Sequence, residues 1–445
     1  MSQPEVVESV DFLFDKNAAK HRTNKFEQPK EGNMKVVLRR GQPFTVKINM
    51  RGTTIMKSNI WVVFTLGSSP NTDVGTKGMA KINFKKQATE DKPTGWDAFI
   101  KKTEGNSHFV QVNSPSNTPV SLWNFHIEIE TEKGNKALFS APNSIWILFN
   151  PWMEADLVHM SETELLNEYV LSDVGKVWRG SKVHDAKGYP WVYGQFDEYV
   201  LPVCMTILKQ VPESERGDPI KVVRTISKMV RTSPFAWTGS IAILEEYYRT
   251  NTGVKWGQCW VFATLVTTIC RALGIPCRNV TNFESAHDTN GSCTIEYYLD
   301  KNNKPINPTK RNESIWNFHV WNDVWMARPD LPKGYGGWQA IDATPQEKSD
   351  GYYQCGPASV EAIRNGSINL KYDVPFIVAE VNADILYLKE DPNSETGYRK
   401  VDQYQRNVGQ GLFTKKPGKY DPNGESDRED VMNQYKHPEG IFDKG

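Results

Sequence analysis

The sequence has 445 residues, of which 53 are Lys or Arg, 53 are Asp or Glu and 38% are hydrophobic. This composition is typical of a globular protein. Zero net charge, without any run rich in Lys and Arg, argues against the basic surface on which nucleic-acid binding depends. The longest apolar runs, Ile60–Phe64 and Ile145–Phe149, are much shorter than the roughly 20 residues of a membrane helix, so we predict no membrane span.

The N-terminus and the cysteines indicate the cellular compartment. Acidic residues stand at the N-terminus, where a secretory signal would carry basic and then apolar residues. We therefore predict a cytoplasmic protein, with release by an unconventional route as the alternative. Six scattered cysteines without a CxxC pair indicate free thiols rather than a disulfide framework or a zinc site. At about 150 residues per domain, the length is consistent with two domains.

The first 150 residues have the alternating pattern of β-strands. Apolar and polar residues alternate over Phe44–Ile48 and again over Phe125–Ile129, and Asn59–Gly67 is a further candidate strand. A Gly- and Lys-rich turn follows Glu130, which predicts a hairpin. Short strands at this spacing predict an immunoglobulin-like β-sandwich domain over residues 1–150.

The remainder, residues 151–445, mixes helical and strand-like patterns. Asp218 and Pro219 are typical of a helix start, and apolar residues follow them at helical spacing as far as Val230. A second apolar stripe runs from Phe262 to Leu273, just before Gly274. Strand-like runs dominate after about Cys293. The predicted fold class is therefore α+β.

Cys259 differs from the other cysteines because it stands at the start of the second predicted helix. The free backbone N–H groups and the dipole at a helix N-terminus favour the thiolate form, which is the nucleophilic one. Cys259 is therefore a candidate nucleophile. The alternative is that it only packs, since cysteine is among the most buried residue types.

A thiol nucleophile needs a base, and the base needs an acceptor that orients it. His319 and Asp342 lie on two strand-like segments, Phe318–Trp325 and Trp338–Asp342, joined by a turn-rich loop. If these strands pair antiparallel with His319 opposite Asp342, the two side chains are within hydrogen-bond reach. Taken singly, each residue is also compatible with a structural role, but the order Cys, His, Asp favours nucleophilic catalysis.

Several motifs resemble those of the animal calcium-dependent transglutaminases. The strongest are GQCWVFA (Gly257–Ala263), TNFESAHD (Thr281–Asp288), WNFHVW (Trp316–Trp321), GWQAIDATPQE (Gly337–Glu347) and FIVAEVNAD (Phe376–Asp384). The resemblance extends from about Val7 to the YKHPEG sequence near the C-terminus. It implies a papain-like catalytic core after the β-sandwich. Members of this family usually carry two further β-barrels, which this sequence lacks, so we expect no nucleotide regulation.

The resemblance also implies a reaction. The Cys259 thiolate would attack the γ-carboxamide of a protein glutamine, and His319, held by Asp342, would protonate the departing ammonia. The thioester would pass to a protein lysine or to a polyamine, which gives an isopeptide crosslink or a modified glutamine. By similarity, Trp237 and Trp316 line the tunnel for the amine, and Trp237 donates its indole N–H to the oxyanion.

Calcium is the cofactor that the resemblance implies. One family site matches a set of oxygen-bearing side chains at alternate positions together with a later glutamate: Asp288, Asn290, Ser292, Thr294 and Glu313. Some relatives carry aspartate at position 290, so Asn290 lowers the ligand charge and predicts weaker binding. A second family site matches Asn382, Asp384 and Glu439.

Two other function classes remain open at this point. A papain-like cysteine hydrolase or deamidase would use the same three catalytic residues with water as the acceptor. A structural homologue would keep the fold without catalysis, but such proteins usually lose the nucleophile, whereas Cys259, His319 and Asp342 are all present.

Overall fold

The computed structural model describes residues 6–28, 34–51, 59–84, 95–130, 134, 136–229, 237–254, 257–310 and 312–438. The chain forms two compact units. The first comprises Met1–Ser161, Gln195–Val222 and Ala272–Ile275, and the second comprises Glu162–Gly194, Val223–Arg271 and Pro276–Gly445. A sheet-rich N-terminal part followed by mixed helices and strands confirms the α+β class. The domain boundary after residue 150 stays a prediction.

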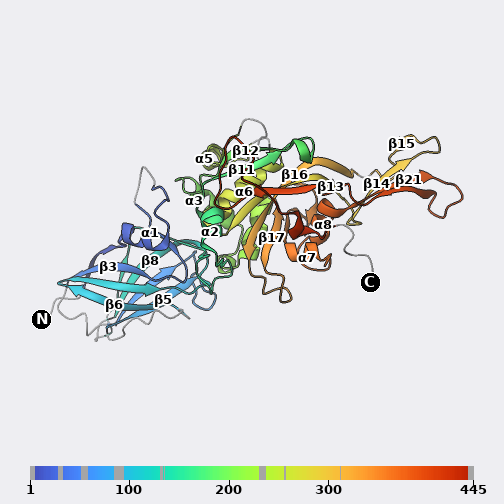
Figure 1. Ribbon diagram of the computed structural model, residues 1–445. Helices are drawn as coiled ribbons and strands as arrows, with labels where there is room; N and C mark the ends of the chain where they lie inside the picture. The colour runs from blue at the N-terminus through green and yellow to red at the C-terminus, as the bar shows by residue number, and fades with distance from the viewer. Residues whose placement is uncertain are drawn as a thin grey trace. The chain divides into compact units, whose positions relative to one another are not determined.

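The first unit is built on ten strands among its described residues (Figure 1). Hydrogen bonds link nine of them in the order β1-β3-β7-β6-β5-β4-β8-β10-β2, and β9 pairs with β8. Their bounds are β1 Val6–Asp11, β2 Val37–Arg39, β3 Phe44–Arg51, β4 Asn59–Thr65, β5 Lys77–Asn83, β6 Asp97–Glu104, β7 Ser107–Asn113, β8 Ser121–Glu130, β9 Lys136–Ser140 and β10 Ile145–Leu148. Helices α1 (Phe14–His21) and α3 (Val200–Leu208) also belong to this unit.

Strand alternation places one hydrophobic core inside this unit. Along β8, Trp123, Phe125 and Ile127 are fully buried, while Asn124 between them is exposed. Buried side chains from strands at both ends of the order join the same core. The predicted hairpin is confirmed, because β8 and β9 pair antiparallel with Glu130 opposite Lys136.

The second unit is organised around a six-stranded antiparallel sheet in the order β20-β17-β16-β13-β23-β24. Its strands are β13 Cys277–His287, β16 Ser314–Met326, β17 Gly337–Asp342, β20 Cys355–Ser359, β23 Gly411–Lys415 and β24 Arg428–Asp430. A smaller sheet contains β14 Thr294–Leu299, β15 Pro305–Ile306, β21 Asp384–Glu390 and β22 Tyr398–Tyr404. Two hairpins complete the unit, β11 Val174–Arg179 with β12 Lys187–Val192, and β18 Lys348–Ser349 with β19 Tyr352–Tyr353. Figure 1 shows β14 and β21 extending away from the central sheet.

Helices accompany this sheet: α2 Thr163–Leu166, α5 Ile241–Thr250, α6 Cys259–Leu273, α7 Val360–Arg364, α8 Val374–Asn382 and α9 Met432–Tyr435. Helix α4 (Pro219–Met229) has residues in both units. The predicted helix from Cys259 is confirmed, and Gly274, with φ of +91°, follows its last residue. Such a left-handed conformation at a helix end favours glycine.

The buried amide of Asn322 fixes α6 against the central sheet. From β16, its Nδ2 atom donates to the Ala263 carbonyl at 2.8 Å and to the Thr267 hydroxyl at 2.9 Å. These bonds hold the helix that begins at Cys259 to the strand that carries His319.

One sequence-based expectation about this sheet, the pairing register of β16 and β17, was wrong. A pairing of His319 with Asp342 would place Asp323 opposite Trp338, but Asp323 pairs with Ala340, so the register of β16 and β17 is shifted by two residues. Continuing this ladder by one pair places Asp342 opposite Trp321, two residues from His319. Because side chains alternate with a period of two, the shift leaves His319 and Asp342 on one face as diagonal neighbours.

The segment after Cys293 consists mainly of strands and loops, as predicted, and the short helices α7 and α8 interrupt the strands. The β-branched residues of α8 favour a strand locally, but Pro375 in its first turn suits a helix start, and Ile377 and Val381 pack in the core beside the sheet.

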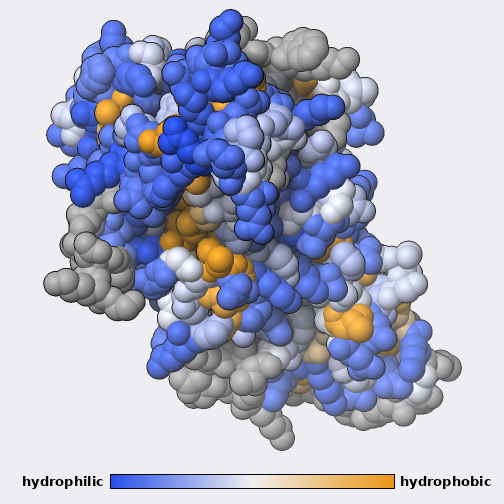
Figure 2. Space-filling view, turned by 90° about the vertical axis from the view of Figure 1, so that its right-hand side faces the viewer, coloured by the Kyte–Doolittle hydropathy of each residue, from blue (hydrophilic) through white to orange (hydrophobic). Residues whose placement is uncertain are grey.

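No helix among the described residues has the length and hydrophobicity needed to cross a bilayer. The face in Figure 2 is mostly hydrophilic, with hydrophobic residues in a few small groups. Isolated exposed hydrophobic residues are normal on protein surfaces.

Candidate active site

Cys259 is the first residue of α6, and 9% of its surface is exposed. The preceding residue, Gln258, closes the first helical turn, since its carbonyl accepts bonds from Val261 N at 2.9 Å and Phe262 N at 3.2 Å. The thiol therefore lies at a helix N-terminus, where the dipole favours a thiolate.

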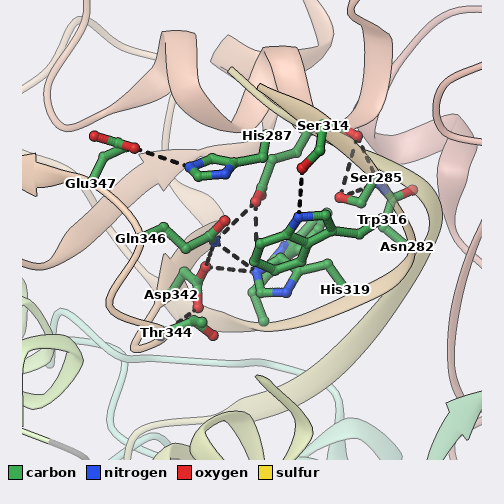
Figure 3. A network of polar contacts seen from close by, with 12 residues as sticks. Asn282, Ser285, His287, Ser314, Trp316, His319, Asp342, Thr344, Gln346 and Glu347 are labelled. Carbon is green, nitrogen blue, oxygen red and sulfur yellow. Dashed lines mark hydrogen bonds and ion pairs between the residues drawn. The ribbon is translucent and has the colours of Figure 1, made fainter. Parts of the chain in front are cut away.

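His319 and Asp342 form the buried pair that the sequence predicted. His319 Nε2 and Asp342 Oδ2 are 2.8 Å apart, and both side chains are almost completely buried (Figure 3). The other carboxylate oxygen, Oδ1, accepts a bond from the Thr344 backbone N–H at 2.8 Å. Backbone and side chain together fix the carboxylate toward the imidazole.

The environment favours a protonated His319. Burial by itself lowers the pKa of an imidazole. Here the charge of Asp342, with a smaller contribution from the ionised fraction of Glu380, and hydrogen bonding to Asp342 and Cys259 outweigh burial, so the pKa of His319 is raised well above its usual value. An imidazolium beside Cys259 stabilises a thiolate and carries the proton that a leaving group needs.

The two nitrogens of His319 have different partners. Nε2 is engaged by Asp342, so Nδ1 is the nitrogen left for the Cys259 thiol. Nδ1 has no bond of standard hydrogen-bond geometry, although the thiol is near enough to raise the pKa of His319. Such bonds between nucleophile and base are often long without substrate and shorten when it binds.

Two residues that the sequence analysis did not single out complete this site. Gln346 donates from Nε2 to Asp342 Oδ2 at 2.7 Å, and the same nitrogen lies 3.3 Å from Glu380 Oε1. Glu380 Oε1 is also 3.5 Å from His319 Nε2. Gln346 lies in the motif GWQAIDATPQE and Glu380 in the motif FIVAEVNAD. The sequence therefore marked both segments, but nothing in it assigned these two side chains a role.

Glu380 lies on α8, which is anchored to the sheet by Asn282 of β13. The Asn282 amide donates to the Glu380 carbonyl at 2.7 Å. Burial raises the pKa of the Glu380 carboxyl to about 8, although the charge of His319 opposes this shift. Glu380 is therefore mostly neutral at pH 7, so Asp342 is the carboxylate that balances the charge of the His319 imidazolium.

Trp316 packs against His319. Its ring is perpendicular to that of His319, with centroids 4.9 Å apart, and its indole N–H donates to Ser314 Oγ at 3.0 Å (Figure 3). Trp237 is half-buried and directly precedes Thr238, whose carbonyl accepts a bond from Val192 N of β12. The structure thus places Trp316 against the triad and ties the segment after Trp237 to the β11–β12 hairpin.

Comparison with known proteins identifies the family. Models of the "Transglutaminase family" and the "Transglutaminase-like superfamily" match residues 8–130 and 215–343. A hemocyte protein-glutamine gamma-glutamyltransferase of Tachypleus tridentatus is 43% identical over 98% of this chain. The crystal structure of red sea bream transglutaminase matches with a TM-score of 0.82 and 32% identity, over 98% of this chain and 66% of that one. The chain belongs to the transglutaminase family.

Other relatives agree with this assignment. Human protein-glutamine gamma-glutamyltransferase K is 38% identical and annulin of Schistocerca americana is 36% identical, each over 98% of this chain. The chain spans 60% of the length of the Tachypleus protein, 54% of the human protein and 59% of annulin.

In this transglutaminase chain, the predicted ligand loop folds around Asp288. Oδ1 of Asp288 accepts bonds from Asn290 N at 2.9 Å and Gly291 N at 3.1 Å, and Oδ2 accepts from Cys293 N at 2.7 Å. The hydroxyls of Ser292 and Thr294 are 2.8 Å apart. Glu313 reaches this loop, since its Oε1 accepts a bond from Thr289 Oγ1 at 3.3 Å. Each of the five predicted side chains thus offers at least one oxygen atom, the donor type that Ca²⁺ prefers.

The second predicted set is described only in part. Asn382 ends α8 and Asp384 begins β21, and both line a cavity of about 530 Å³. Asp384 Oδ2 accepts a bond from Gln403 Nε2 at 2.7 Å. Glu439 lies outside the described residues.

Among the described residues, one group of three titratable side chains has ligating atoms within 4.8 Å of each other, namely His319, Asp342 and Glu380. Because the imidazole nitrogen of this group is paired with Asp342, we assign the cluster to catalysis rather than to metal binding.

Proposed function

We propose that this chain is a protein-glutamine γ-glutamyltransferase with an acyl-enzyme mechanism. The supporting observation is the geometry of a helix-start thiol beside a buried His–Asp pair, in a chain 43% identical to the Tachypleus protein-glutamine gamma-glutamyltransferase. The substrates would be glutamine-bearing proteins as acyl donors, and lysine-bearing proteins or polyamines as acceptors.

In the acylation step, the Cys259 sulfur attacks the carbonyl carbon of a glutamine γ-carboxamide. A C–S bond forms and the C–N bond breaks, while the imidazolium of His319 gives its proton to the departing ammonia. Asp342 holds the ring in place and balances its charge. The oxyanion would accept bonds from the Cys259 N–H and from the indole N–H of Trp237, and such a donor typically contributes about a hundred- to a thousandfold in rate.

In the second step, a primary amine attacks the thioester carbon and His319 accepts the proton that the amine loses. A C–N bond replaces the C–S bond, which gives an isopeptide crosslink and restores the thiol. Attack by water would give glutamate instead. Trp316 covers one side of His319 and is suited to exclude water from the thioester.

We also propose Ca²⁺ as the cofactor. The oxygen donors of Asp288, Asn290, Ser292, Thr294 and Glu313 fit this ion, and Asn382 and Asp384 with Glu439 would form a second set. Bound calcium would supply positive charge that orders these loops. The residues that carry the chemistry are those of the triad.

The test is incubation of the chain with casein, Ca²⁺ and a fluorescent primary amine. Covalent incorporation of the amine, absent from the Cys259→Ala variant, supports the transferase. Casein fragments without incorporation would indicate a cysteine protease, and conversion of glutamine to glutamate alone would indicate a deamidase. A folded chain that gives none of these products contradicts catalysis.

A further inference from the structure

One charged side chain next to the nucleophile has no part in the mechanism above. Arg179 is the last residue of β11, and its guanidinium carbon lies 3.7 Å from the ring centroid of Tyr189 and 5.0 Å from that of Trp260. Trp260 directly follows Cys259. The two aromatic rings therefore hold a cation beside the start of α6.

This cation is not neutralised within the described residues. Arg179 forms no ion pair there, and its Nε atom is buried without a hydrogen-bond partner. Two carboxylates of this region are bonded to other groups. Asp185, between β11 and β12, accepts bonds from Ser181 Oγ and Lys182 N, and Glu284 of β13 pairs with Lys182 at 2.5 Å.

The charge of Arg179 is also coupled to the nucleophile. Burial lowers the pKa of Arg179, whereas the negative charge that Cys259 carries as a thiolate acts in the opposite direction. Arg179 as a whole is half-buried, so part of the residue remains accessible to a bound ligand. A partly accessible arginine with an unpaired donor suits a carboxylate, the anion that protein side chains carry and that a guanidinium binds through two parallel hydrogen bonds.

We propose that Arg179 is a specificity-determining residue that binds a carboxylate of the acyl-donor protein, an Asp or Glu within two residues of the reactive glutamine. Arg179 packs on Trp260, the residue that follows Cys259. An extended segment advances about 3.3 Å per residue, so a side chain one or two residues from the reactive glutamine is the one expected to meet Arg179. This inference rests on the proposed transferase function, because it assigns a substrate class to that site.

The first experiment needs no transferase activity. The rates at which iodoacetate and iodoacetamide alkylate Cys259 are measured by mass spectrometry, and their ratio reports the local positive charge. We expect Arg179→Gln to lower the iodoacetate-to-iodoacetamide ratio about fivefold, and Arg179→Glu to lower it further. Arg179→Lys should largely keep the ratio, which separates charge from misfolding. Arg399→Gln removes an exposed arginine of β22 and should leave the ratio unchanged.

The second experiment compares kcat/KM for matched peptides with Glu, Ala or Lys next to the reactive glutamine. We expect the parent to prefer the Glu peptide over the Lys peptide about tenfold or more, Arg179→Gln to remove this preference and Arg179→Glu to reverse it. An unchanged alkylation ratio, or an unchanged peptide preference in Arg179→Gln, would overturn the proposal while transfer continues. If the parent modifies none of the peptides, the result contradicts the proposed transferase function itself, independently of the alkylation ratio.

Discussion

The proposed catalytic triad of Cys259, His319 and Asp342 is fixed by contacts within the chain, whereas the Asp288 loop is proposed to need a bound ion. In the triad, the imidazole of His319 is already fixed by Asp342, and the helix that carries Cys259 is held to the same strand by Asn322. In the loop, both carboxylate oxygens of Asp288 accept bonds from the chain's own N–H groups. The groups proposed to carry out the chemistry are thus preorganised, whereas the carboxylate proposed to bind calcium already accepts hydrogen bonds from the chain.

This difference suggests that the two regions control different properties of the enzyme. Changes in the triad should alter kcat at saturating calcium, whereas changes in the loop should alter the calcium concentration needed for half-maximal activity. The predictions below test this separation.

The largest effect is expected from Asp342→Asn. Asp342 raises the pKa of His319, so without its charge that pKa falls and less imidazolium is present at neutral pH. We expect kcat at saturating calcium to fall about a thousandfold or more. The alkaline limb of the kcat/KM profile should move to lower pH. An unchanged profile would show that Asp342 does not control the protonation of His319.

A smaller effect, of a different kind, is expected from Asp288→Asn. The change removes one negative charge from the loop and keeps the shape of the side chain. We expect the calcium concentration for half-maximal activity to rise about tenfold, with kcat at saturation nearly unchanged. Calorimetric titration of calcium into the Cys259→Ala variant, with and without the loop change, measures binding without turnover. Equal affinities would remove Asp288 from the ligand set.

Asn290→Asp changes the charge of the loop in the direction opposite to Asp288→Asn. It adds a carboxylate to the same loop, so the half-maximal calcium concentration should fall about threefold. A rise instead would mean that like-charge repulsion with Asp288 or Glu313 dominates. The same calorimetric titration decides between these results.

The smallest effect is expected from Glu380→Gln, which is also the control for Asp342→Asn. Because the pKa of Glu380 is about 8, the carboxyl is mostly neutral at pH 7, and glutamine replaces it with a neutral group of similar shape. We expect kcat at pH 7 to change less than about threefold. A loss as large as that of Asp342→Asn would show that Glu380 acts as a charged partner of His319.

The triad itself was predictable because its chemistry leaves local signals. Cys259 has a helix start around it, and His319 and Asp342 stand on adjacent strand-like segments. The register was wrong by two residues, yet the two side chains still meet, since a shift by two keeps them on one face.

Other features depend on contacts that the local sequence does not contain. Glu380 reaches His319 only because α8 packs against β13, and the strand-like composition of this segment concealed the helix. Arg179 belongs to a hairpin whose approach to Cys259 is set by the fold. The oxygen donors of the Asp288 loop stay a predicted ligand set, and the backbone bonds that Asp288 accepts could not be predicted.

The most direct test of the account is calcium-dependent incorporation of a fluorescent primary amine into casein, with the parent chain compared with Cys259→Ala. The account predicts incorporation that rises with calcium for the parent and none for the variant. Equal incorporation by both proteins, or none by a folded parent at any calcium concentration, would contradict it.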